Sequence, residues 1–179
     1  MFIKELQQKQ AIEVAQLLND FLPFEEESEK TINEAGGIQL VAIENEEIIG
    51  YIAGVHVEKF EQAFPYDFPQ LQTVAEDFEG GKTFYTSHLV VHPKMRGKGI
   101  GTKLVKQYME KVQHEAERLV VVGWVKSDTK MWDAEKQFKA HQFEREIFIP
   151  QYFEPYNVYC PNCNGKCICD ATILYKKFD

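Results

Sequence analysis

The chain of 179 residues lacks any apolar run near the length of about 18 residues that a membrane-spanning helix needs. Its first ten residues, MFIKELQQKQ, lack the basic region and the apolar stretch of a secretory signal peptide. Basic residues are in deficit, with 20 Lys and Arg against 28 Asp and Glu, which leaves a net charge of −8. Because nucleic-acid binding depends on Lys and Arg at phosphates, we expect a cytoplasmic protein with neither a membrane nor a nucleic-acid partner.

Internal repeats and low-complexity linkers are also missing from the chain. Hydrophobic residues make up 44% of the composition and charged residues 27%, which is the usage of an ordinary globular protein. A chain of 179 residues is long enough to bury one hydrophobic core and is short for two. We therefore predict one domain over residues 1–179.

A regular succession of apolar patterns is present instead. Helical spacing predicts amphipathic helices over residues 11–22, from the glycine turn to about residue 117, and over residues 129–140. Alternating or continuous apolar runs predict a hairpin and four further strands, over residues 38–43, 48–57, 83–93, 119–125, 143–153 and 171–178. A strand, a glycine turn, a helix and a second strand follow one another between residues 83 and 125 and form a βαβ unit. The fold class is therefore α/β (α+β) with a mixed sheet.

Two segments are interpreted as surface structure. The acidic run EEESEK at residues 25–30 is most simply a solvated face or loop. Residues 60–82 are rich in aromatics, Pro and Gly and predict a long loop or short helix. Such a segment is either a lid over a substrate or a surface insertion whose aromatics enter the core.

A glycine turn joins the strand at residues 83–93 to the following helix. Gly97, Gly99 and Gly101 allow a close backbone approach, and Arg96 and Lys98 add positive charge. The first N–H groups of a helix are unpaired and lie at the positive end of its dipole. The turn is therefore suited to an anion such as a pyrophosphate.

The sequence matches neither of two common phosphate-binding motifs, the dinucleotide fingerprint at this turn and the P-loop before residue 83. The dinucleotide fingerprint G-x-G-x-x-G, counted from Gly97, needs a glycine where Thr102 stands. A P-loop that ends in the GKT triplet of residues 81–83 needs a glycine where Glu76 stands. The pattern that remains, R-x-x-G-x-G from Arg96 to Gly101, follows a strand and opens an amphipathic helix. In this context the sequence resembles the GNAT superfamily of acetyl-CoA-dependent N-acetyltransferases.

The resemblance implies a fold, a reaction and a cofactor site. It implies a single GNAT-type domain, with a mixed, mostly antiparallel sheet, a central βαβ unit and flanking helices. It also implies direct acetyl transfer from acetyl-CoA to a primary amine, on a small molecule or a lysyl side chain, and a possible homodimer. The residues assigned to acetyl-CoA are Leu89, Val90 and Val91 for the pantetheine arm, and Arg96, Gly97, Lys98, Gly99, Ile100, Gly101 and Thr102 for the pyrophosphate.

The sequence departs from the family in the helix after the buried strand. There the family often reads N-x-x-A-x-x-x-Y with a following Gly, and its Tyr serves the leaving thiolate. Met131, Phe138 and Gln142 take the Asn, Tyr and Gly places, and Phe138 has no proton to give. The thiolate then leaves unaided, or another tyrosine such as Tyr108, Tyr152 or Tyr156 assists. The alternative is a weak or inactive CoA-binding, sensing or protein-interaction module on the same scaffold.

One histidine is a candidate for the base that deprotonates the amine. His88 lies just before the strand segment assigned to the pantetheine, and an unperturbed imidazole pKa of about 6.5 suits this task. Strand alternation alone is equally compatible with a buried structural histidine.

All four cysteines fall within ten residues, in the stretch YCPNCNGKCICD. Their spacing is C-x2-C-x3-C-x-C, and in a reducing compartment four thiolates on a tight turn favour a tetrahedral metal over disulfides. We expect a structural Zn²⁺ at these residues, with a redox-active loop or free thiols as the alternatives. The predicted ligands are Cys160, Cys163, Cys167 and Cys169.

Overall fold

The computed structural model describes residues 1–22, 26–78 and 81–178. Its main sheet has seven strands in the order β1-β2-β3-β4-β5-β9-β6, and β7 and β8 form a separate two-stranded sheet. The pairings β1–β2, β2–β3, β5–β9 and β6–β9 are all antiparallel. The predicted class, a mixed α/β fold with a mostly antiparallel sheet, is confirmed.

The chain forms two compact units, Met1–Val55 with Thr86–Val112, and His56–Tyr85 with Gln113–Asp179. The elements that lie wholly or largely in the first unit are β1 (Phe2–Glu5), η1 (Gln8–Gln10), α1 (Ala11–Phe21), α2 (Glu29–Glu34), β2 (Ile38–Glu44), β3 (Glu47–Val57), β4 (Thr83–Val91), η3 (Pro93–Met95) and α5 (Ile100–Glu115). Those of the second unit are α3 (Phe60–Ala63), η2 (Pro69–Leu71), α4 (Gln72–Asp77), β5 (Arg118–Val125), α6 (Glu135–Lys139), β6 (Arg145–Ile149), η4 (Glu154–Tyr156), β7 (Tyr159–Cys160), β8 (Gly165–Lys166) and β9 (Asp170–Lys177).

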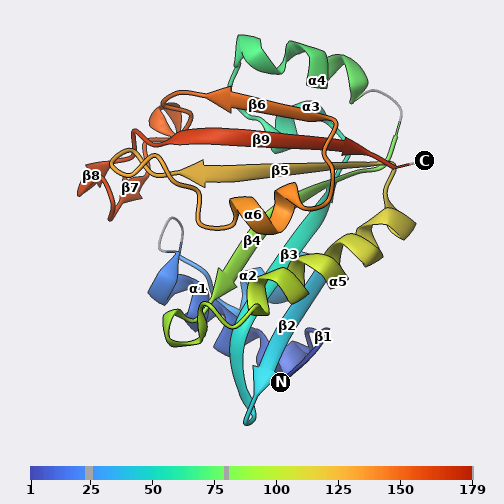
Figure 1. Ribbon diagram of the computed structural model, residues 1–179, viewed down its shortest axis with the longest axis vertical. Helices are drawn as coiled ribbons and strands as arrows, with labels where there is room; N and C mark the ends of the chain where they lie inside the picture. The colour runs from blue at the N-terminus through green and yellow to red at the C-terminus, as the bar shows by residue number, and fades with distance from the viewer. Residues whose placement is uncertain (23–25, 79–80, 179) are drawn as a thin grey trace. The chain divides into compact units, whose positions relative to one another are not determined.

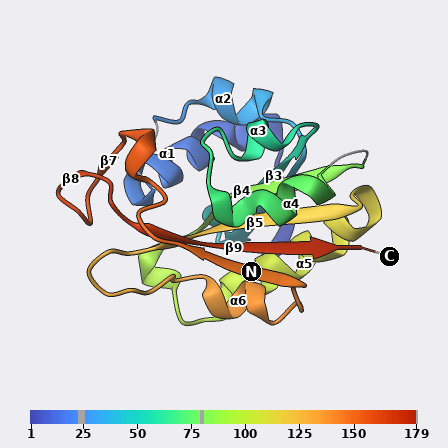
Figure 2. The same cartoon turned by 90° about the horizontal axis from the view of Figure 1, so that it is seen from above.

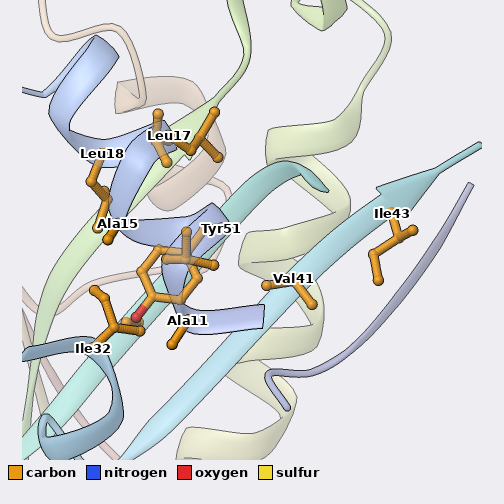
Figure 3. Close-up of a cluster of buried hydrophobic side chains, with 11 residues drawn as sticks. Ala11, Ala15, Leu17, Leu18, Ile32, Val41, Ile43 and Tyr51 are labelled. Atoms are coloured by element: carbon orange, nitrogen blue, oxygen red, sulfur yellow. The ribbon is translucent and has the colours of Figure 1, made fainter. Parts of the chain in front are cut away.

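The core of the first unit is an apolar cluster between α1, α2 and the sheet. The apolar stripe of α1, which includes Ala11, Val14 and Leu18, packs with Ile32 of α2 onto strand residues such as Tyr51. Figure 3 shows Tyr51 among these side chains. Burying a large apolar side chain of this kind contributes roughly 1.5–3 kcal/mol, so this cluster holds α1 and α2 on the sheet.

Strand β3 carries helices on both of its faces. Tyr51 enters the α1 cluster, whereas its neighbour Gly50 points the other way, as strand alternation requires. A Cβ on Gly50 would lie 3.0 Å from Leu104 Cδ1 and 3.4 Å from Ile100 Cγ2, so α5 sits close on this face. Figure 2 shows α1 and α2 on one side of these strands and α5 on the other. The glycine at position 50 thus lets the first turn of α5 approach the sheet.

The β2–β3 hairpin confirms the predicted strand pair. Its register runs from Ile38 opposite Gly54 to Glu44 opposite Glu47. The turn residues Asn45 and Glu46 both have positive φ, at 51° and 69°, as a tight primed turn requires.

The second unit is built on β5, β9 and β6. The apolar run predicted as a buried strand is β5, whose pairing with β9 extends from Arg118 opposite Lys177 to Val125 opposite Asp170. In Figure 1 the β7–β8 hairpin lies beyond the end of β5 at which the chain enters β9. No described helix is long and apolar enough to cross a membrane.

Three segments of the structure differ in detail from the elements that the sequence predicts. The helix expected over residues 129–140 is limited to α6, because Lys126 N–H donates to Met131 O at 3.0 Å and Trp132 packs over Gly123. The strand expected over residues 143–153 ends at Ile149, since Tyr152 turns into the core. Residues 60–82 contain α3, η2 and α4, and residues 79 and 80 lie outside the described part.

Candidate functional site

The glycine turn connects β4 to α5 through the short helix η3. At the end of β4, His92 N–H donates to Ile49 O at 2.9 Å, which fixes the strand end to β3. The His92 ring then accepts a hydrogen bond at Nδ1 from Lys94 N–H at 3.3 Å and caps η3. His92 therefore anchors the start of the turn to the sheet.

Gly97 and Gly99 both adopt positive φ, at 78° and 76°. No atom lies within 4 Å of a Cβ built on either residue, so the backbone conformation and not crowding explains the glycines. The open space leaves the backbone accessible from solvent.

The start of α5 is exposed on one side and anchored on the other. Ile100 is buried against β3, whereas residues 96–99 are exposed. Among the described residues, Lys103 N–H is the first amide of the helix to find an acceptor, Gly99 O at 3.1 Å. The preceding N–H groups are those that a helix cannot pair internally, and they lie at its positive end.

Two cations flank these amides. Arg96 Nε donates to Val91 O at 3.2 Å, which holds the guanidinium beside the turn. Lys98 is exposed and its Nζ lies 3.5 Å from Met95 Sδ. The turn therefore combines exposed amides with positive side chains, which is the chemistry that binds a phosphate.

The strand segment predicted to meet a pantetheine arm has mixed surroundings. Val90 is buried in the α1 cluster, and Leu89 and Val91 are half-buried. The Val91 carbonyl already accepts from Arg96. Of the remaining predicted cofactor residues, Gly101 is half-buried and Thr102 is exposed in the first turn of α5.

His88 lies beside a carboxylate that the sequence analysis assigned to a solvated run. Its Nε2 lies 3.4 Å from Glu27 Oε1, and its Nδ1 lies 3.2 Å from Ser87 Oγ. Glu27 is itself positioned by Asn19, whose side chain bonds both the N–H and the C=O of Glu27 at 2.8 Å. Burial raises the pKa of the nearby Tyr51 hydroxyl, and the negative charge of Glu27 raises it further. Glu27 was missed because an acidic run carries no signal of a partner distant in sequence; residue 25 of that run lies outside the described part.

The alternation of β4 breaks just before this histidine. Thr86 Oγ1 lies 3.1 Å from the hydroxyl of Tyr108 on α5, so Thr86 faces that helix. His88, two residues later, instead faces Glu27 and Tyr51 on the opposite side of the sheet. A regular strand would place both side chains on one face. The irregularity turns the imidazole toward the α1–α2 connection.

The tyrosines considered as proton donors are all bonded or buried. Burial raises the pKa of Tyr108, which is fully enclosed. Tyr156 donates to the Tyr152 hydroxyl at 2.8 Å, and burial raises the pKa of both phenols. Phe138, at the position of the family tyrosine, is buried and stacks on Trp132 with ring centroids 5.7 Å apart. Phe138 therefore has a packing role in the second unit.

The four cysteines converge in the second unit. Their sulfur atoms all lie within 4.8 Å of one another, and no disulfide joins them. Burial opposes ionisation of the Cys163 thiol, but hydrogen bonds to its sulfur from the Ile168 backbone and Ser127 outweigh it and lower its pKa to about 7. Burial raises the pKa of Cys160 and Cys167. The predicted convergence of the four thiols is confirmed, and the arrangement has the ligand number of a metal site.

Solved structures with the same fold include several acetyltransferases. Arabidopsis thaliana NAA60, in complex with a bisubstrate analogue, is 14% identical with a TM-score of 0.70, and the match covers 99% of this chain and 98% of that one. The ribosomal-protein-S18-alanine N-acetyltransferase of Escherichia coli is 14% identical, with a TM-score of 0.65 and coverage of 99% and 94%. The ribosomal-protein-alanine N-acetyltransferase of Brucella melitensis is also 14% identical, with a TM-score of 0.63 and coverage of 99% and 100%. At this identity the likeness establishes the fold.

Sequence comparison supplies the family. No curated protein shows significant similarity to the chain. A family model described as the acetyltransferase (GNAT) family matches residues 3–134, which include the glycine turn, His88 and Glu27. Because this match spans most of the sequence, the chain belongs to the acetyltransferase (GNAT) family.

Proposed function

We propose that the protein transfers the acetyl group of acetyl-CoA directly to a primary amine. The observation that carries this proposal is the turn at residues 96–99, in which two glycines with positive φ expose the amides that open α5. Membership of the GNAT family supports acetyl-CoA as the ligand whose pyrophosphate this turn receives. The amides would bind the phosphate oxygens, and Arg96 and Lys98 would neutralise their charge.

The reaction needs the amine in its neutral form. The amine nitrogen attacks the thioester carbonyl carbon, a C–N bond forms, the C–S bond breaks, and CoA leaves as its thiolate. The proton released by the ammonium needs an acceptor, and we assign it to His88. Nε2 faces Glu27 Oε1 at 3.4 Å, so we assign the amine proton to Nδ1, which the Ser87 hydroxyl approaches at 3.2 Å and would have to release. The Glu27 carboxylate then stabilises the imidazolium that forms.

The leaving thiolate requires no acid from the chain. A thiol pKa of about 8.5 makes the thiolate a fair leaving group near neutral pH. Phe138 is therefore compatible with turnover, although it stands where the family often has a tyrosine.

A peptide amine is the first acceptor class to test. Two of the solved neighbours are named for acetylating the alanine of a ribosomal protein. The net charge of −8 favours a cationic acceptor over an anionic one. Peptides with an N-terminal alanine, matched peptides blocked at the N-terminus but carrying a lysine, and a polyamine separate the α-amine, ε-amine and small-molecule classes.

The test is acetyl transfer by the full chain to this panel, with CoA release followed by a thiol reagent and the product identified by mass. The proposal expects an acetylated amine and one released thiol per product, and it expects His88→Ala to lower the rate without loss of acetyl-CoA binding. Tight binding of acetyl-CoA with no turnover on any amine would instead identify a CoA-binding module.

A further inference from the structure

The geometry points to a structural Zn²⁺ site formed by Cys160, Cys163, Cys167 and Cys169, which locks the segment before β9 to the loop after β5. This inference does not depend on acetyl transfer, because the four cysteines lie outside the residues that the family model matches. Cys160, Cys167 and Cys169 are buried and Cys163 is half-buried. Buried thiols that face one another need either protons or a shared cation.

The sulfur positions suit a tetrahedral ion. A Zn–S bond of about 2.3 Å places the sulfurs of a tetrahedron about 3.8 Å apart. Cys163 Sγ and Cys169 Sγ lie 3.5 Å apart, and the widest separation in the set is within 4.8 Å. A disulfide needs about 2.05 Å, so the four thiols are grouped without being joined.

Polar side chains surround the ligands and connect two segments. Ser127 Oγ, in the loop after β5, lies 3.4 Å from Cys163 Sγ. Asn162 Nδ2 lies 3.3 Å from Ser127 Oγ and 3.9 Å from Cys169 Sγ. A metal at the four sulfurs would therefore fix the β5 loop and the β7–β8 hairpin together.

Few further contacts hold this segment: Cys167 N–H donates to Val158 O at 2.9 Å, and Phe153 N–H donates to Cys169 O at 3.3 Å. The hairpin consists of β7 and β8, whose register comprises only Tyr159 opposite Lys166 and Cys160 opposite Gly165. A hairpin of this length is marginal in water without a further constraint. Tyr159 and Ile168 are 60% and 44% exposed, so the hairpin contributes little apolar burial of its own. A metal supplies the missing stability where the apolar core is small.

Zinc is the ion that this ligand set favours. Soft thiolates in a tetrahedral S₄ set select zinc or iron over magnesium, calcium and manganese. Four protein ligands fill the coordination shell of Zn²⁺ and leave no open position for a substrate, so the role is structural.

Metal analysis of the full chain, purified under reducing conditions without added zinc, tests the site. We expect about one Zn²⁺ per chain, released in step with modification of the four thiols by an organomercurial. We expect Cys163→Ser to lose most of this zinc. The matched control is Ile168→Ala, which lies between two ligands with an exposed side chain and should keep it.

A second measurement holds even if Cys163→Ser fails to fold. Co²⁺ exchanged into the wild-type chain should give the intense visible and thiolate charge-transfer bands of a tetrahedral S₄ site, and a strong chelator should lower the melting temperature of the protein. Four freely titratable thiols without metal, an iron spectrum in the purified protein, or zinc retained by Cys163→Ser would each overturn the proposal. None of these readouts uses acetyl-CoA, so they leave the proposed function to its own test.

Discussion

Glu27 Oε1 lies 3.4 Å from Nε2 of His88, and the two side chains are only 15% and 29% exposed. The pair joins the α1–α2 connection to the irregular part of β4, on the face opposite α5. Glu27 is held in this position by two hydrogen bonds from its backbone to the Asn19 side chain, each 2.8 Å long. This pair is therefore suited to take the proton of an amine.

We predict that Glu27→Gln lowers acetyl transfer by about tenfold or more at neutral pH, because the imidazolium loses its counter-charge. Steady-state rates from pH 6 to 9, with acetyl-CoA affinity measured in parallel, provide the check. Glu26→Gln is the matched control, since Glu26 is exposed and belongs to the same acidic run. Equal rates for the two variants would remove Glu27 from the mechanism.

Arg96→Glu is predicted to weaken acetyl-CoA binding by about tenfold or more. The substitution replaces a cation beside the α5 amides with an anion that repels phosphate. Lys106→Glu makes the same charge change further along α5, at an exposed lysine 4.0 Å from Glu110, and should leave the affinity within about twofold. Similar losses in both variants would indicate only a general effect of net charge.

Gly99→Ala is predicted to destabilise the fold by about 1–2 kcal/mol, because an L-residue at φ 76° is strained. The open space around this residue rules out a clash as the cause. Gly165→Ala is the control, since its Cβ is equally free of neighbours and its φ is not in the left-handed region. Urea denaturation compares the two, and a neutral Gly99→Ala would mean that the turn adapts.

We predict that Asp77 makes a pH-dependent contribution to the stability of the second unit. Its carboxylate lies 2.9 Å from Lys177 Nζ and 2.7 Å from Arg145 Nη2, and the hydrogen bond from Lys177, followed by the charges of both partners, lowers the pKa of Asp77 despite some burial. In the unfolded chain the pKa of an Asp is about 3.9, and in the folded protein the pKa of Asp77 lies below this value. Asp77 therefore stabilises the fold at pH values above about 3.9, and this stabilisation is lost as the pH falls through the folded-state pKa.

Asp77→Asn should therefore lower the melting temperature at pH 7, and the difference from wild type should shrink steadily below about pH 4. Asp67→Asn, at an exposed carboxylate for which the described residues form no ion pair, should show no such trend. A constant difference between wild type and Asp77→Asn down to pH 2 would show that the effect is not electrostatic.

Local patterns predicted much of this fold. The apolar stripe of α5 and the apolar run of β5 were both visible in the sequence, and β5 begins one residue before its expected start. The four cysteines converge as their spacing indicated, because only a few residues separate neighbouring ligands. In each case the information is contained in a short stretch of sequence.

Other features depend on contacts between distant residues. The late start, at Glu135, of the helix expected from residue 129 follows from Trp132 packing over Gly123, where a Cβ would lie 2.4 Å from the indole ring. The pairing of Glu27 with His88 requires the α1–α2 connection to reach the irregular segment of β4. No periodicity within either segment reports such a contact.

The central claim is that the glycine turn binds the pyrophosphate of acetyl-CoA, and calorimetric titration of the full chain with acetyl-CoA tests it most directly, with NAD and ATP as controls. The account predicts saturable binding of one acetyl-CoA per chain, with an affinity in the micromolar range and at least about tenfold tighter than for either control. Absence of acetyl-CoA binding, or equal binding of the three ligands, would contradict it.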